Sequence, residues 1–235
     1  MKRSHMVFIA SIVIMVFIKI SLSYTLIFAQ QPNDQAEKNV TFQWTFGAIR
    51  KSQSGSEFKA ITRDTVLETG DKIKFFLRAE KSCFIYLIYQ SSEGDLTVLF
   101  PYRFKLLDDG YEISKDYYIP NGNRWFELDD YTGTEKFYLI ATANRLFKLE
   151  DLIIEYETVD KSNKIVLGEK IISETRRLRK KHHNLKSQAE RPVTIIGQLR
   201  GDDKTNPSKL RNLRNHAVET SAGNFFIRTF TIEHR

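Results

Sequence analysis

Alternation of apolar and polar residues is the main pattern between residues 40 and 142. Residues 41–46 place an aromatic side chain at every second position, as expected for a strand with one buried face. Residues rich in Gly, Pro, Asp and Ser mark turns around 52–57, 67–71 and 91–95. The same reasoning predicts further strands at residues 72–77, 83–89, 96–100, 116–119, 124–128 and 135–142.

Short strands that are separated by turns, with no long helix between them, predict a mainly β fold. We expect an antiparallel β-sandwich. Its core should include side chains from the alternating or wholly apolar strands. The side chains expected there are Phe75, Tyr86, Ile88, Phe100 and Ile140.

The hydrophobic period changes after residue 142. Leu149, Ile153 and Tyr156 follow a helical spacing, which predicts a short amphipathic helix closing one end of the sandwich. A longer helix with a narrow apolar stripe is predicted over residues 167–190. The remaining elements are expected to be strands at 193–196 and 224–232, and a polar loop with one helical turn over 201–215.

The N-terminal residues have the pattern of a secretory signal peptide. Two basic residues precede an uncharged apolar run at residues 6–18, and small residues place cleavage after Ser23 or Ala29. The alternative is a retained membrane anchor over residues 6–29, which would hold Lys19 near its middle. Both interpretations predict export to the periplasm or the extracellular space, and the second adds anchoring to the inner membrane.

A polar leader at residues 30–39 should connect this segment to one domain at residues 40–235. The single cysteine, Cys83, excludes an internal disulfide. Because Cys83 opens an apolar strand, an inert buried thiol is favoured over a reactive one.

Charge is distributed unevenly along the chain. The formal net charge is +7, but residues 30–163 carry 17 Lys/Arg and 22 Asp/Glu, whereas residues 164–215 carry 14 and 5. We expect a basic helical insert at about 161–220. Its charge indicates an anionic envelope component or an acidic protein surface as partner, rather than nucleic acid, with an ordinary solvated helix face as the alternative. The candidate partner-binding residues are Arg176, Arg177, Arg179, Lys180 and Lys181.

An ordered series of short motifs runs through the middle of the chain. It comprises residues 67–75 (Leu-Glu-Thr-Gly-Asp-Lys-Ile-Lys-Phe), residues 84–88, Gly94, Leu99-Phe100-Pro101, Tyr118-Ile119-Pro120, Phe126, residues 133–135 and residues 139–142. Over residues 41–155, with 224–232 as a closing strand, the chain resembles the bacterial family called domain of unknown function 4384 (DUF4384). The resemblance implies an Ig-like β-sandwich that serves as an accessory module in exported bacterial proteins. It carries over no catalytic residues.

No pattern typical of catalysis stands out. The neighbours His182 and His183 lack the spacing of a helical metal site. Asp108-Asp109-Gly110 and Asp129-Asp130 are interpreted as acidic turns rather than calcium sites. The sequence therefore predicts a non-enzymatic exported ligand- or protein-binding or assembly module of the bacterial cell envelope, without a cofactor. The alternatives are an enzyme of unrecognised type and an adhesin-like surface protein.

Overall fold

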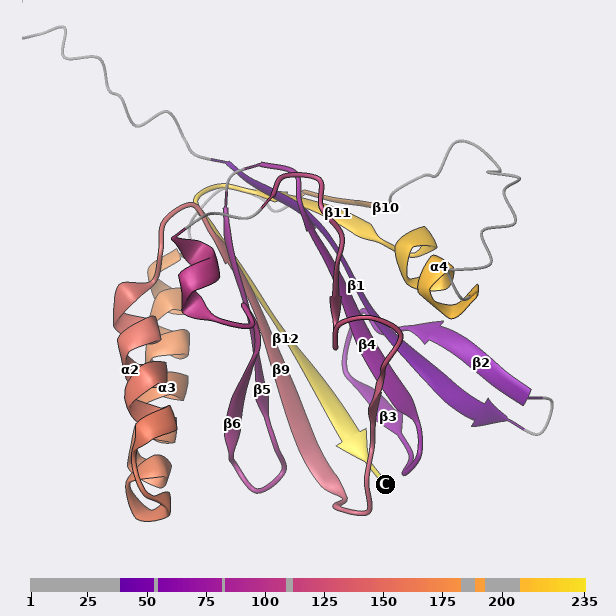
Figure 1. Cartoon of the computed structure of the whole chain (residues 1–235), viewed down its shortest axis with the longest axis horizontal. Coiled ribbons are helices and arrows are strands. Elements are labelled where there is room, and N and C mark those ends of the chain that lie inside the picture. The colour runs from indigo at the N-terminus through magenta and orange to yellow at the C-terminus, as the bar shows by residue number, and fades with distance from the viewer. Residues whose placement is uncertain (1–38, 53–54, 82, 109–111, 183–188, 193–207) are drawn as a thin grey trace, which may run out of the picture. The chain divides into compact units, whose positions relative to one another are not determined.

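The computed structural model describes residues 39–52, 55–81, 83–108, 112–182, 189–192 and 208–235 (Figure 1). Residues 38–235 form one compact unit. The predicted signal peptide or anchor lies outside the described residues. Among the helices that are described, none is long and apolar enough to cross a membrane.

One sheet has seven strands in the described part of the chain. Its order is β10-β11-β1-β4-β7, with β2 paired to β1 and β8 paired to β4, and all of its pairs are antiparallel. The strands are β1 (Val40–Ser52), β2 (Gly55–Ala60), β4 (Lys72–Ala79), β7 (Tyr117–Ile119), β8 (Phe126–Glu127), β10 (Ala189–Pro192) and β11 (Val218–Ala222).

The second sheet has five strands in the order β3-β12-β9-β5-β6. Its central pair, β9 with β12, runs antiparallel in register from Phe225 opposite Thr142 to His234 opposite Gly133. Only β3 with β12 is parallel among the described pairs of this sheet. The strands are β3 (Thr65–Leu67), β5 (Phe84–Gln90), β6 (Leu96–Phe100), β9 (Gly133–Thr142) and β12 (Phe225–His234).

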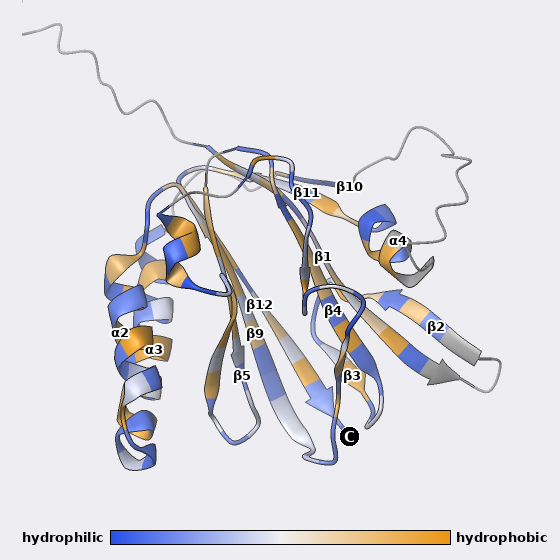
Figure 2. Ribbon diagram, viewed as in Figure 1, coloured by the Kyte–Doolittle hydropathy of each residue, from blue (hydrophilic) through white to orange (hydrophobic). Residues whose placement is uncertain are grey.

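The two sheets pack face to face through an aromatic core. The ring of Phe46 on β1 stacks on Phe75 at 3.9 Å between centroids, and contacts Phe137 at 5.1 Å and Phe230 at 5.4 Å. The first two residues belong to the seven-stranded sheet and the last two to the five-stranded sheet, so this cluster joins the layers. Figure 2 shows hydrophobic and hydrophilic positions alternating along β1 and β4, which is the pattern that predicted the strands.

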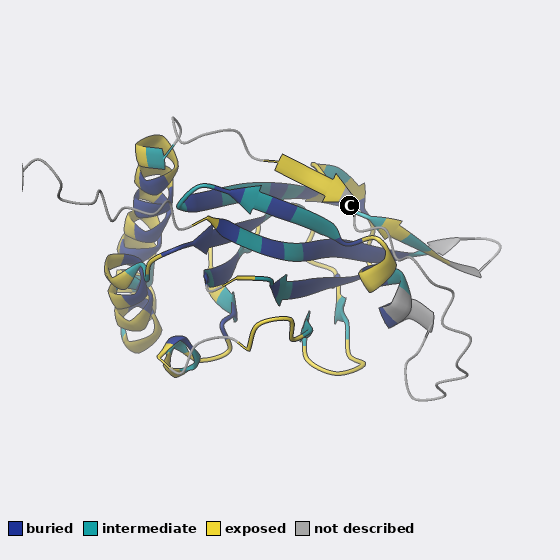
Figure 3. Ribbon diagram, turned by 90° about the horizontal axis from the view of Figure 1, so that it is seen from above, coloured by how far each residue is buried: buried dark blue, intermediate teal, exposed yellow. Residues whose placement is uncertain are grey.

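Two helices cover the outer face of the five-stranded sheet (Figures 1 and 3). They are α2 (Phe147–Thr158) and α3 (Lys161–His182), and their buried side chains pack with Tyr86 and Ile140 in a second core. The prediction that the first helix closes one end of the sandwich is therefore wrong. Outward side chains of both β5 and β9, among them Tyr86, Ile88 and Ile140, are apolar or aromatic and buried, so this face of the sheet needs cover as well.

A shorter helix, α4 (Ser208–Asn215), packs on the outer face of the seven-stranded sheet with Phe76. The Thr45 hydroxyl donates to the carbonyl of Leu213 at 2.7 Å. Close approach requires Gly47 on β1, since a Cβ there would lie 2.7 Å from the Leu213 side chain. The remaining element is the 3-10 helix η1 (Phe104–Leu107).

The sequence predictions hold for the mainly β fold and for every strand predicted between residues 41 and 142. The closing strand is also present as β12. All of the expected core side chains are at most 1% exposed: Phe75, Tyr86, Ile88, Phe100 and Ile140.

Several boundaries differ from the prediction. The helix expected at 167–190 is α3, which begins earlier because the Asp160 carboxylate accepts the amide N–H of Asn163 at 3.0 Å and caps the first turn. Residues 189–190 belong to β10 instead of this helix. The turn expected at 52–57 includes paired residues of β1 and β2, and the loop at 201–215 contains α4. The strand expected at 193–196 lies outside the described residues.

Replacing Phe100 by Ala should lower the free energy of unfolding by about 3–5 kcal/mol, because it removes a buried ring and leaves a cavity. Chemical denaturation measures the change. Phe147, which is 62% exposed, provides the matched control, and its replacement by Ala should change the same quantity by less than about 1 kcal/mol. Equal losses in the two variants would contradict the packing described for β6.

Candidate functional site

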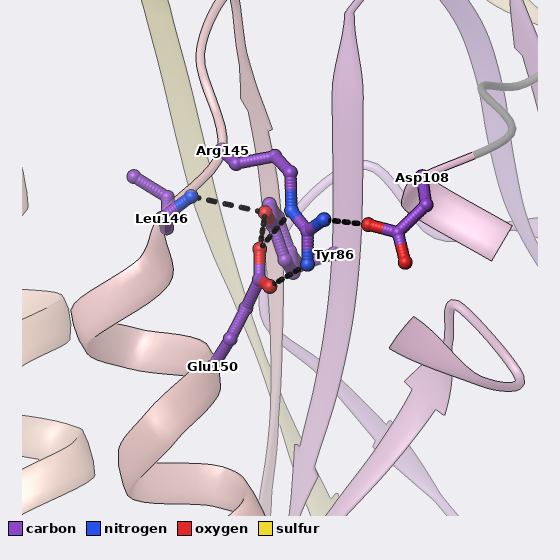
Figure 4. A network of polar contacts seen from close by, with 5 residues as sticks. All are labelled: Tyr86, Asp108, Arg145, Leu146 and Glu150. Atoms are coloured by element: carbon purple, nitrogen blue, oxygen red, sulfur yellow. Dashed lines mark hydrogen bonds and ion pairs between the residues drawn. The ribbon is translucent and has the colours of Figure 1, made fainter. Parts of the chain in front are cut away.

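One buried polar network lies between the five-stranded sheet and α2 (Figure 4). The Tyr86 hydroxyl donates to Glu150 Oε1 at 2.6 Å and accepts the Leu146 amide N–H at 3.1 Å. The Arg145 guanidinium binds both oxygens of Glu150 and also pairs with Asp108. Burial and the Glu150 carboxylate raise the pKa of Tyr86. Because these groups satisfy one another, the network fastens α2 to the sheet and is not a site for a ligand.

Lys74 lies on the outward side of β4, and its side chain is fully buried. Its ammonium donates to the carbonyl oxygens of Pro120 at 2.6 Å, Gly122 at 2.8 Å and Arg124. Burial, and then the nearby Arg124 charge, lower the pKa of Lys74 to about 8. The amine is therefore still charged at neutral pH, and it organises the loop between β7 and β8 rather than a reaction.

A cleft of about 280 Å³ opens between the two sheets. Its residues come from β4, β5, β6, β8 and β9 and from the turn after β8. The apolar ones are Ile73, Leu99, Phe126, Leu128 and Phe137, and the polar ones are Tyr89, Thr97, Glu127, Asp129 and Glu135.

A shift in strand register shapes one wall of this cleft. Leu87 pairs with Phe100 but the next residue of β5, Ile88, pairs with Val98. Leu99 is thus the extra residue of a bulge. As a result Leu99 and its neighbour Phe100 both contact the core between the sheets, and Leu99 also reaches the cleft.

Glu135 forms the buried end of the cleft and belongs to a polar network. Its carboxylate accepts a hydrogen bond from the Tyr89 hydroxyl and lies 3.5 Å from His234 Nδ1. The opposite ring nitrogen, Nε2, lies 3.2 Å from the Thr69 hydroxyl, which itself donates to the Asp129 carbonyl at 2.9 Å. The hydroxyl therefore accepts from Nε2, and the proton of a neutral ring is assigned to that nitrogen.

Burial raises the pKa of Glu135, although the neighbouring His234 opposes the shift. The side chain is only 7% exposed while it lines an open cleft. A carboxyl group whose pKa is raised by burial, at the wall of a cavity, is typical of functional sites. Neither Glu135 nor His234 was among the residues that the sequence singled out.

The cleft lies in the part of the chain that matches a known family. Residues 66–145 match the family model described as "Domain of unknown function (DUF4384)". We refer to residues 66–145, which this model matches, as the DUF4384 segment. No curated protein and no solved structure matches the chain. Every residue that lines the cleft lies within the DUF4384 segment, whereas His234 and the basic residues of α3 lie outside it.

The five basic candidates outside the DUF4384 segment do not act alike. Arg177 binds the buried Glu174 through two hydrogen bonds of 2.8 and 2.5 Å, and Lys148 adds a third at 3.0 Å. These partners lower the pKa of Glu174 to about 2. Arg179 donates to the Thr229 hydroxyl on β12. All five candidates are exposed, and these contacts tie Arg177 and Arg179 to neighbouring groups of the domain: Arg176, Arg177, Arg179, Lys180 and Lys181.

Other side chains considered in the sequence are structural in the described part of the chain. Cys83 is buried, and burial raises the pKa of its thiol to about 12, so it stays protonated. His182 stacks on Phe225 at 4.4 Å between ring centroids, and burial lowers its pKa. Asp108 pairs with Arg145, as described above. Among the described residues no group of His, Cys, Asp or Glu is arranged to hold a metal ion.

Replacing Glu135 by Gln should raise the free energy of unfolding at pH 7, because the amide keeps the shape without the buried charge. The raised pKa means that the folded protein holds this proton more tightly than the unfolded chain, whose value is near 4.5. The contribution of the carboxyl to stability is therefore complete below about pH 4.5 and is lost as the pH rises through the raised pKa.

Urea denaturation at two pH values measures this effect. The advantage of the Glu135→Gln variant should be present at pH 7 and should disappear near pH 4. Glu93, an exposed acid in the hairpin between β5 and β6, supplies the control, since Glu93→Gln should change stability little at either pH. An advantage that persists at low pH would contradict the assignment of the cost to the carboxylate charge.

Proposed function

We propose that this protein is a non-enzymatic binding module of the bacterial cell envelope, built on an Ig-like β-sandwich. The observation that supports this proposal is the cleft between the two sheets. It offers an apolar floor with a few polar groups at its walls, which is the usual composition of a ligand site. In this proposal residues 161–220 are a basic insertion between the strands of the family fold.

The residues of the cleft favour binding over catalysis. Among its described lining residues there is no serine, cysteine, lysine or histidine, so the usual pairing of a nucleophile with a base is absent there. The alternative, an enzyme of unrecognised type, would have to use Glu135 and Asp129, which differ in burial, as acid and base. An adhesin-like surface protein is the other alternative, and it would require exposure of the domain on the cell surface.

The proposed location rests on the sequence of residues 1–29, with their basic start and apolar run. Export would place the domain in the periplasm or the extracellular space, or hold it at the inner membrane if residues 6–29 are retained. A binding module there would meet proteins and anionic envelope components rather than nucleic acid.

Filling the cleft tests the proposed binding function. A photocrosslinking residue at Thr97, on the exposed rim, should capture a partner in the native envelope, and Leu99→Trp should abolish that capture because the larger ring occupies the cavity. Ile113→Trp, at a site that is 56% exposed and away from the cleft, should leave capture intact. Capture that is equally strong in both variants would exclude the cleft as the binding site.

Charge reversal tests the basic residues separately. Changing Arg176, Lys180 and Lys181 to Glu should abolish capture of an anionic partner. The melting temperature should stay nearly unchanged, because surface charges steer association but contribute little to folding. Native capture should also weaken as salt rises to physiological strength. Capture that survives both the charge reversal and physiological salt would show that these residues are an ordinary solvated helix face and do not bind the partner. The test residues are Arg176, Lys180 and Lys181, and the control reversal uses the exposed Lys59, Lys81 and Lys170.

A further inference from the structure

The charges in the cleft all have one sign. Its ionisable carboxylates come from Glu127, Asp129 and Glu135, and no basic side chain is among the described lining residues. Lys72 reaches Glu127 at 2.8 Å, on a pair whose side chains are both exposed. Glu135 is the most buried of the three, and Nδ1 of His234 lies 3.5 Å from its carboxylate. An anionic ligand would therefore meet repulsion throughout the cleft, whereas a cation would gain from each wall.

Aromatic rings stand beside these carboxylates. Tyr89 and Phe137 lie 5.0 Å apart between centroids with their planes inclined at 37°, and Phe126 lines the same space. The negative faces of aromatic rings attract organic cations, most strongly where water is displaced. Aliphatic walls from Ile73 and Leu99 complete the cleft, and they suit a hydrocarbon stem rather than a bare metal ion.

The size of the cleft limits the ligand. The volume of the cleft is about 280 Å³. It lies just below the range of about 300–1,000 Å³ that holds drug-sized ligands. The cleft therefore fits a small molecule or a single long side chain.

We propose that the cleft binds an organic ammonium or guanidinium ion on an apolar stem. The cationic head lies between Glu135 and Asp129, and the stem packs against Leu99, Phe126 and Phe137. This inference rests on the proposed binding function and specifies its ligand. The chemistry is shared by free organic amines and by the lysine or arginine side chain of a protein partner.

Calorimetric titration of the purified chain with three phenyl-bearing probes of different charge tests the sign of the charge that the cleft prefers. Phenethylammonium should bind at least tenfold more tightly than neutral phenethyl alcohol, and phenylpropionate should not bind. Nα-acetyl-lysine methylamide forms a fourth arm. Tighter binding of this peptide-like probe than of phenethylammonium would assign the ligand to a protein side chain, and weaker binding would assign it to a free amine.

Two substitutions locate the cation. Glu135→Gln should reduce phenethylammonium affinity at least tenfold without affecting phenethyl alcohol, and the exposed Asp129→Asn should reduce it by a smaller factor. Since Glu135→Gln is expected to stabilise the fold, loss of binding in that variant cannot be attributed to unfolding. Glu93→Gln, which removes a carboxylate outside the cleft, should leave all affinities unchanged.

The outcomes separate this inference from the proposed function. Equal affinity for the ammonium and the alcohol, or cation binding that survives both substitutions, would overturn the organic cation while the cleft remained a binding site. Failure of every probe to bind would also overturn it. Loss of partner capture in Leu99→Trp would still support the binding module in that case, because that experiment does not depend on which ligand the cleft takes.

Discussion

The packing of Phe46 against Phe75, Phe137 and Phe230 is the interaction on which the rest of the structure depends. These rings come from four strands in two sheets and fix the layers at the spacing of a packed sandwich, about 10 Å. Along β9 the inward row continues from Phe137 to Glu135, two residues toward the strand's beginning. The aromatic packing ends there and the cleft begins, so the same register that aligns the rings also places the carboxylate at the wall of the cavity.

Three of the polar residues in or beside the cleft stand at the ends of inward rows whose neighbouring members are apolar. Tyr89 follows Leu87 on β5, Glu135 precedes Phe137 on β9, and His234 follows Ile232 on β12. In the sheet Tyr89 pairs with Phe137, and Glu135 pairs with Ile232, so the rows converge at one corner. A fold selected for stability alone would continue the apolar rows. Departure from that pattern at a single corner is what local rules lead us to expect of a functional site.

The strands and the core were predictable because period-two alternation depends only on neighbouring residues, as in Phe42, Trp44 and Phe46. β3, which has only three residues, and β11, which is mostly polar, were missed because they are defined by pairing with strands distant in the chain. Glu135 carried a usable signal, a charge in phase with the apolar residues of its strand. The proximity of Glu135 to His234 could not be predicted, because it follows from the register between β9 and β12, two strands that are distant in the chain.

Strand β12 lies inside its sheet, between β3 and β9, although it comes late in the chain. The strands on either side of it are synthesised long before it, and until residues 225–234 emerge from the ribosome β9 keeps one open edge. An open edge is a template for unwanted strand pairing. The five-stranded sheet can therefore be completed only once residues 225–234 are available to pair with both β3 and β9.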